Sequence, residues 1–66
     1  MNQFKTQAAK IAASKRPYAL VVQYGFGGRE QNDVLSTHST HNLADKAARA
    51  SGYDTFLAVR DAREYI

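Results

Sequence analysis

The longest run of β-branched and aromatic residues occupies positions 18–24, with the sequence YALVVQY. Successive side chains of an extended strand point to opposite faces, and here both faces are apolar at the centre of the run. A strand with two apolar faces usually lies in the middle of a sheet rather than at its edge. We therefore predict that residues 18–24 form the central strand of a small sheet.

Residues 2–15 have the spacing of an amphipathic helix. Phe4, Ala8 and Ile11 recur at the intervals that bring side chains onto one helical face. The asparagine that opens this range is a suitable N-cap residue. Pro17 ends the segment, because the residue before a proline avoids helical geometry.

A second helix is predicted between Asn42, the expected N-cap residue, and Gly52, which suits the left-handed conformation that follows many helices. Its apolar face is mostly alanine, which allows a helix to lie close to a sheet. This face comprises Leu43, Ala44, Ala47, Ala48 and Ala50. Asp45 and Arg49 are four residues apart and are expected to form an ion pair.

The chain between the first strand and the next predicted strand, residues 34–38, is expected to form an irregular hairpin. Gly27 and Gly28 suit the positive φ angles of a tight turn. The tip is expected to extend beyond the body of the domain. The alternative is a longer loop through Asp33, because residues 29–33 have low β propensity.

The predicted element order is helix–strand–strand–helix–strand, with the third strand at residues 55–60. The connection through the second helix returns the third strand beside the first. We therefore predict an α+β fold in which a three-stranded antiparallel sheet of order 2-1-3, with strand 1 central, packs with two helices. Residues 61–66 either extend the third strand or form a short helical turn. With 66 residues, the chain is expected to be one domain spanning 1–66.

Composition narrows the possible functions. The absence of cysteine excludes disulfides, a thiol nucleophile and cysteine-based zinc sites. No apolar run approaches the ~20 residues of a membrane span, and lysines interrupt any signal-peptide pattern at the N-terminus, so we expect a soluble cytoplasmic protein. The net charge of +3 argues against a DNA mimic and permits contact with an acidic protein or with nucleic acid.

His38 and His41 are the only candidates for metal binding or catalysis. A zinc site needs further converging ligands, and a catalytic triad needs a nucleophile and an orienting acid in a geometry that spacing does not specify. We favour ordinary surface histidines and predict no catalytic residue, no metal and no cofactor. The glycine-rich stretch 25–28 lacks the G-x-G-x-x-G spacing and a following helix, which favours turn chemistry over phosphate binding.

Three groups of residues are candidates for partner binding. Phe26 and Arg29, at the glycine-rich tip, combine an aromatic ring with an arginine, as binding hot spots often do. The N-terminal segment carries basic residues and no acid, so it is suited to lie along a phosphate backbone. These basic residues include Lys10, Lys15 and Arg16. Lys46 and Arg49 supply a second basic group, and the simpler interpretation of both groups is a solvated outer face.

In element order, residues 18–60 resemble the compact, cysteine-free proteins that bacteriophages use against host machinery, including anti-CRISPR proteins and small RNA polymerase inhibitors. The resemblance implies occlusion of a surface rather than chemistry, and it implies no particular functional residues. We therefore expect a small non-enzymatic binding protein of phage or mobile-element origin that inhibits a host defence complex or polymerase. Its partner would be a larger host protein or nucleoprotein complex in the host cytoplasm, without a membrane, and the chain itself a monomer or small homodimer. The alternative is a protein that binds DNA or RNA through the basic N-terminal helix.

Overall fold

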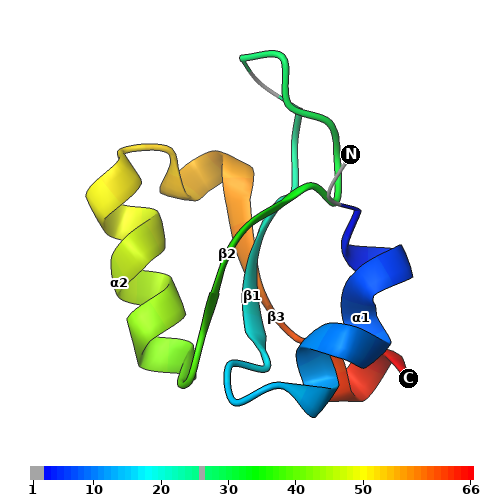
Figure 1. The fold of residues 1–66 in the computed structure, drawn as a ribbon. Helices are drawn as coiled ribbons and strands as arrows, with labels where there is room; N and C mark the ends of the chain where they lie inside the picture. Colours follow the sequence, from blue (N-terminus) through cyan, green and yellow to red (C-terminus); the bar gives the residue numbers. More distant parts are fainter. Residues whose placement is uncertain (1–2, 26) are drawn as a thin grey trace.

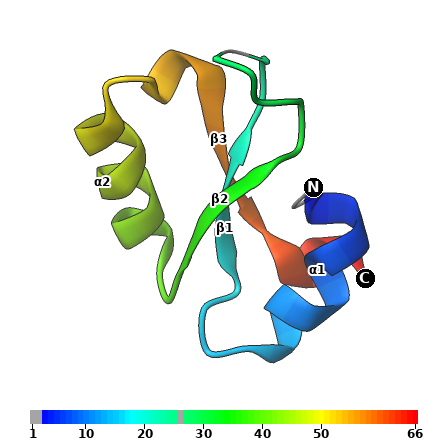
Figure 2. The same cartoon turned by 45° about the horizontal axis from the view of Figure 1, so that its top comes forward.

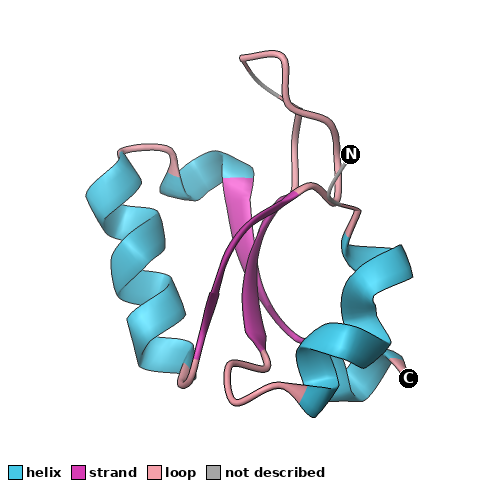
Figure 3. Cartoon of the chain, in the orientation of Figure 1, coloured by secondary structure: helices cyan, strands magenta, loops and turns pink. Residues whose placement is uncertain are grey.

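A three-stranded sheet lies between two helices that cover its opposite faces (Figures 1 and 3). The computed structural model describes residues 3–25 and 27–66. In chain order, the elements are α1 (Phe4–Ala13), β1 (Tyr18–Val22), β2 (Val34–His38), α2 (His41–Ser51), the 3-10 helix η1 (Asp54–Phe56), β3 (Leu57–Asp61) and the 3-10 helix η2 (Ala62–Tyr65). The sheet order is β2-β1-β3 with β1 antiparallel to both neighbours, which confirms the predicted fold.

The central position of β1 follows from its two apolar faces. Four of its five residues are buried, and only Tyr18 at its start is half-buried. Tyr18 pairs with His38 of β2 on one side and with Asp61 of β3 on the other. The register with β2 shifts between Leu20 and Val21, so the β1–β2 ladder is irregular at its middle.

The first half of the core lies between α1 and the sheet. Phe4, Ala8 and Ile11 are buried, as the helical spacing predicts. They pack against Ala19 and Val21 of β1 and against Ala62 of η2. The helix ends at Ala13, before the buried Pro17.

The second half of the core lies between the sheet and α2. Leu20 and Val22 of β1 pack there with Leu57 of β3 and Ala48 of α2. Because small alanines line this side of α2, the helix lies close to the strands. Figure 2 shows α1 and α2 on opposite sides of the sheet. In the described part of the chain, no helix has the length and apolar character needed to cross a membrane.

The start of α2 differs from the sequence prediction. The N-cap residue is Thr40 rather than Asn42, and the Thr40 side chain accepts a hydrogen bond from the backbone N–H of Leu43 at 3.2 Å. The helix therefore begins at His41, one residue before the predicted cap. Its apolar face is also narrower than predicted, because Leu43 is 48% exposed while Ala44 and Ala48 are buried.

Two further boundaries are corrected. The first strand ends at Val22 rather than at residue 24, and the third strand begins at Leu57 because residues 54–56 form η1. The tail forms a helical turn rather than a longer strand, and the Tyr65 ring packs edge-on against Phe4 with 4.9 Å between ring centroids. The predicted cap Asn2 lies outside the described residues. The observed N-cap residue of α1 is Gln3.

Candidate partner-binding surface

The loop between β1 and β2 projects beyond the sheet, and its base is tied to η1 (Figure 1). The backbone N–H groups of Gln23 and Tyr24 both donate to the carbonyl of Phe56, at 2.8 and 3.1 Å. On the returning side, the N–H of Asn32 donates to the carbonyl of Val22 at 2.7 Å. Both ends of the loop are therefore held by backbone hydrogen bonds, one end to η1 and the other to β1.

The loop base is also tied to the start of α1. Asp33 accepts a hydrogen bond from the Gln3 side chain at 2.8 Å and one from the N–H of Glu30 at 3.1 Å. The first N–H of the helix, on Phe4, donates to the carbonyl of Asn32 at 2.7 Å. The loop thus satisfies one of the N–H groups that have no partner within the helix, and the Gln3 side chain makes no capping bond. Asn32 adopts a positive φ of 71° to make this turn.

The tip itself follows the turn chemistry that the sequence predicts. Gly27 and Gly28 have φ angles of 53° and 81°, which only glycine adopts readily. A Cβ atom on Gly25 would lie 3.1 Å from the carbonyl oxygen of Arg29, so the two sides of the tip approach closely. Arg29 is exposed, and the predicted anchor Phe26 lies outside the described residues.

Three large aromatic residues are exposed at the same end of the molecule as the tip. Tyr24, Tyr53 and Phe56 have 59%, 51% and 40% of their surface exposed. The bond from the N–H of Tyr24 to the carbonyl of Phe56, and the bond from the N–H of Phe56 to the carbonyl of Tyr53, link the three positions. We call Tyr24, Arg29, Tyr53 and Phe56 the tip surface.

Sequence reasoning missed the three aromatic members of this surface. Tyr24 was expected in the first strand and Phe56 in the third strand, and Tyr53 was not a candidate. No local signal separates these rings from core residues, because aromatic residues favour strands and their exposure depends on which elements cover them.

The basic candidates do not gather at one place. Lys10 belongs to α1, whereas Lys46 and Arg49 belong to α2, and these helices cover opposite faces of the sheet (Figure 2). Lys15 and Arg16 follow α1 at the end of the sheet away from the tip (Figure 1). All five are exposed. Arg49 also forms the predicted ion pair with Asp45, at 3.1 Å.

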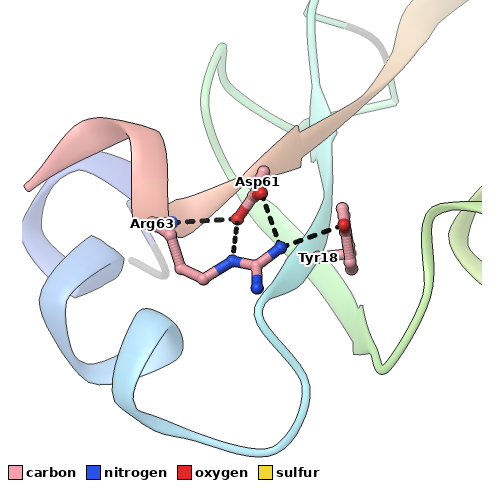
Figure 4. A network of polar contacts seen from close by, with 3 residues as sticks. All are labelled: Tyr18, Asp61 and Arg63. Carbon is pink, nitrogen blue, oxygen red and sulfur yellow. Dashed lines mark hydrogen bonds and ion pairs between the residues drawn. The ribbon is translucent and has the colours of Figure 1, made fainter.

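A polar network lies at the end of the sheet opposite the tip (Figure 4). The Arg63 guanidinium donates to both carboxylate oxygens of Asp61, at 2.9 and 2.8 Å, and to the Tyr18 hydroxyl at 3.0 Å. The backbone N–H of Arg63 donates to the same carboxylate at 3.0 Å. These hydrogen bonds, the side-chain bonds above all, hold the pKa of Asp61 below its ordinary value, and the same carboxylate raises the pKa of Arg63.

The two histidines flank this network without forming a metal site. The His38 Nε2 atom lies 2.7 Å from the Ser36 hydroxyl oxygen, and the His41 ring packs edge-on against Tyr18 with 6.1 Å between centroids. Within residues 3–25 and 27–66, no three histidine or carboxylate side chains converge as metal ligands. The arrangement is that of a surface network stabilising the strand ends.

No known protein-family model, curated protein or solved structure matches this chain.

Proposed function

We propose that the chain is a small non-enzymatic binding protein whose tip surface contacts, and thereby occludes, a larger macromolecular partner. The observation that carries the proposal is the projecting loop, whose base is held by β1, η1 and α1, with Tyr24, Tyr53, Phe56 and Arg29 exposed around it. Aromatic side chains and arginine contribute most to binding energy at protein interfaces. A loop with a rigid base loses less conformational freedom when it binds.

The partner we propose is an acidic surface on a host protein or nucleoprotein complex, such as a defence complex or a polymerase. The net charge of +3 and the exposed Arg29 favour an acidic surface. The element order shared with small phage inhibitors supports a host machine as the target and a phage or mobile element as the source. Action by occlusion needs affinity and coverage, and it needs no catalytic group.

Affinity capture from a bacterial lysate, with and without nuclease, tests this proposal when it includes matched variants. We expect a stoichiometric partner that survives nuclease treatment and is lost with Arg29→Glu. The control is Arg16→Glu, which makes the same change of charge at an exposed site at the other end of the sheet. Equal retention of the partner by both variants would exclude the tip surface.

Truncating an exposed aromatic residue gives a second, uncharged test. Tyr24→Ala should weaken partner binding by tenfold or more, about 1.4 kcal/mol, as expected for a hot-spot side chain. Ile66→Ala removes an apolar side chain that is 74% exposed at the chain end far from the tip, and should leave binding unchanged. Isothermal titration with the captured partner measures both.

The second candidate function is nucleic-acid binding through the end of α1. Lys10, Lys15 and Arg16 are all exposed, and no acidic residue precedes Glu30 in the sequence. This function predicts a steep loss of affinity with salt, and weaker binding when Lys10 and Lys15 are replaced by glutamine. With this function, nuclease treatment should remove every captured partner, and Arg29→Glu should weaken binding less than the lysine replacements do.

A further inference from the structure

The segment from Val34 to Ala44 carries no Asp, Glu, Lys or Arg, although such residues make up 23% of the chain. This uncharged segment forms β2, the following turn and the first turn of α2. It also contains no proline or glycine. Edge strands of soluble proteins usually carry charge, proline or a cover that prevents pairing with another chain. The uncharged segment has neither a charged residue nor a proline.

The outer side of β2 is open for backbone pairing beyond the start of the strand. Within the described residues, β2 itself pairs with β1 alone, whereas Asp33, just before it, forms an isolated antiparallel bridge with Gln3. The bonds of Val22 to Asn32 and Asp33 show that the backbone groups of Val22 face β2, and this direction alternates along an antiparallel strand. The backbone N–H and C=O groups of Leu20 therefore also face β2, and those of its partner Ser36 face β1. The N–H and C=O of the next residue, Thr37, consequently point to the open edge.

The opposite edge of the sheet is built differently. β3 carries Arg60 and Asp61, and Asp61 belongs to the polar network with Arg63 and Tyr18. Charged side chains along a strand edge disfavour pairing with a second chain, because each ion would lose water at the interface. The two edges therefore differ in their capacity to pair, and β2 is the edge suited to it.

The apolar stripe of α2 extends past the sheet on the β2 side. His41 and Leu43 point about 200° apart on a helix. His41 packs against Tyr18, whose hydroxyl accepts a bond from Arg63 just beyond β3. Ala44 is the buried residue of the first turn and therefore faces the sheet, and Leu43 points about 100° from it. Because the connection from β2 through α2 to β3 is right-handed, this rotation places Leu43 on the side of α2 toward β2. Leu43 is 48% exposed there.

We propose that this chain forms a homodimer in which β2 pairs antiparallel with β2 of a second copy, and the Leu43 side of each α2 packs against that of the other. Antiparallel pairing of identical strands has two-fold symmetry, so the same patch serves both copies. Copies with a net charge of +3 repel each other, and the uncharged segment lets them meet without opposing like charges. α1 packs mainly against β1 and η2, and the residue before it, Gln3, meets this edge at Asp33, next to the start of β2.

The size of the interface makes Leu43 essential. A strand of five residues spans only ~17 Å, so strand pairing by itself covers a narrow strip. A standard interface takes ~800 Å² from each partner, out of 4414 Å² for this chain. The side of α2 that carries Leu43 and Ala47 must therefore supply much of the contact. Substitution of Leu43 should consequently break the dimer without disturbing the core.

Sedimentation velocity over a concentration series tests the dimer with Leu43→Glu. We expect a dimer for the wild-type chain and at least a tenfold higher dimer dissociation constant for the variant, because two carboxylates would face each other. Ile66→Glu is the matched control, since it places the same charge on an exposed apolar site away from β2. A monomeric wild-type chain, or equal dissociation constants for both variants, would overturn the proposal.

Cysteine cross-linking tests the position of the interface, and the natural chain has no cysteine to interfere. Residues facing each other across the two-fold axis lie within disulfide range. We expect oxidation to link the chain through Ser36→Cys or Thr37→Cys, whichever lies on the axis, and not through Arg60→Cys on β3. A dimer that neither β2 cysteine can link would place the interface elsewhere. Arg29→Glu should leave the dimer unchanged, so this test is independent of partner binding at the tip.

Discussion

Replacing Phe4 by alanine should remove most of the contact that holds α1 on the sheet. Phe4 is 2% exposed, and Ile11 is the only other large apolar side chain that α1 buries in the described structure. Truncation of a buried phenylalanine to alanine costs ~3–5 kcal/mol, through lost burial and the cavity left behind. A domain of 66 residues has a free energy of unfolding of only ~3–10 kcal/mol. The variant is therefore expected to lose about a third or more of its free energy of unfolding, and all of it where the wild-type value lies at the low end of this range.

Part of this loss comes from the contact between the rings of Phe4 and Tyr65. The rings meet edge-on at 4.9 Å with an angle of 81° between their planes. Such aromatic pairs contribute ~0.5–1.5 kcal/mol beyond the area they bury. A double-mutant cycle with Phe4→Leu and Tyr65→Leu isolates this coupling, because leucine keeps much of the apolar volume at each site.

Urea unfolding followed by far-ultraviolet circular dichroism measures these free energies, since the chain has no tryptophan. We expect Phe4→Ala to move the midpoint toward zero urea, and the cycle to give a coupling of ~0.5–1.5 kcal/mol. Hydrogen exchange should show loss of protection in α1 before the sheet. A destabilisation below ~1 kcal/mol for Phe4→Ala would refute the argument, because it would mean that α1 is not docked through this ring.

Two further outcomes follow from local contacts. Thr40→Ala should lower the free energy of unfolding, measured in urea, by ~1 kcal/mol because it removes the acceptor for the N–H of Leu43. Asn42→Ala should leave it nearly unchanged, and the reverse ranking would mean that Asn42 is the N-cap residue. The pKa of Asp61, measured by NMR titration, should lie below its ordinary value of 3.8 and return toward it in Arg63→Ala. Since the pKa of Asp61 is lowered in the folded state, this carboxylate stabilises the fold above pH ~4 and ceases to do so as the pH falls through its folded pKa. An Asp61 pKa that is unchanged in Arg63→Ala would contradict the network.

Periodicity predicted the elements that bury a continuous apolar face. The alternation in residues 18–24 predicted a central strand, and the spacing of Phe4, Ala8 and Ile11 predicted the buried face of α1. Gly52 was predicted as the residue that ends α2, and it adopts a φ of 80°. In each case a local rule and the tertiary packing favour the same structure.

Boundaries were predicted less well where two residues had similar local preferences. Thr40 and Asn42 are both good cap residues, and the position at which α2 meets the sheet decides between them. Leu43 fits the apolar spacing of the helix as well as Ala44 does. Only the width of a three-stranded sheet leaves Leu43 at its edge.

The candidate surface depends still more on tertiary structure. Arg29 was predicted at the tip from its glycine-rich neighbours. Tyr24 and Phe56 are 32 positions apart in the sequence, and they meet because the strand β1 lies beside β3 and η1. The basic residues were predicted as two groups, and the placement of α1 and α2 on opposite faces keeps those groups apart.

The sequence by itself determined which segments of this protein are helices and strands, because hydrophobic periodicity and turn residues act over a few neighbouring positions. It also determined that the strand at 18–22 is central, because only a central strand buries both of its faces. The tertiary structure decided which face each helix covers, how η1 and α1 hold the base of the tip, and that β2 is an open edge. These features depend on contacts between residues far apart in the chain, such as the hydrogen bonds from Gln23 and Tyr24 to Phe56.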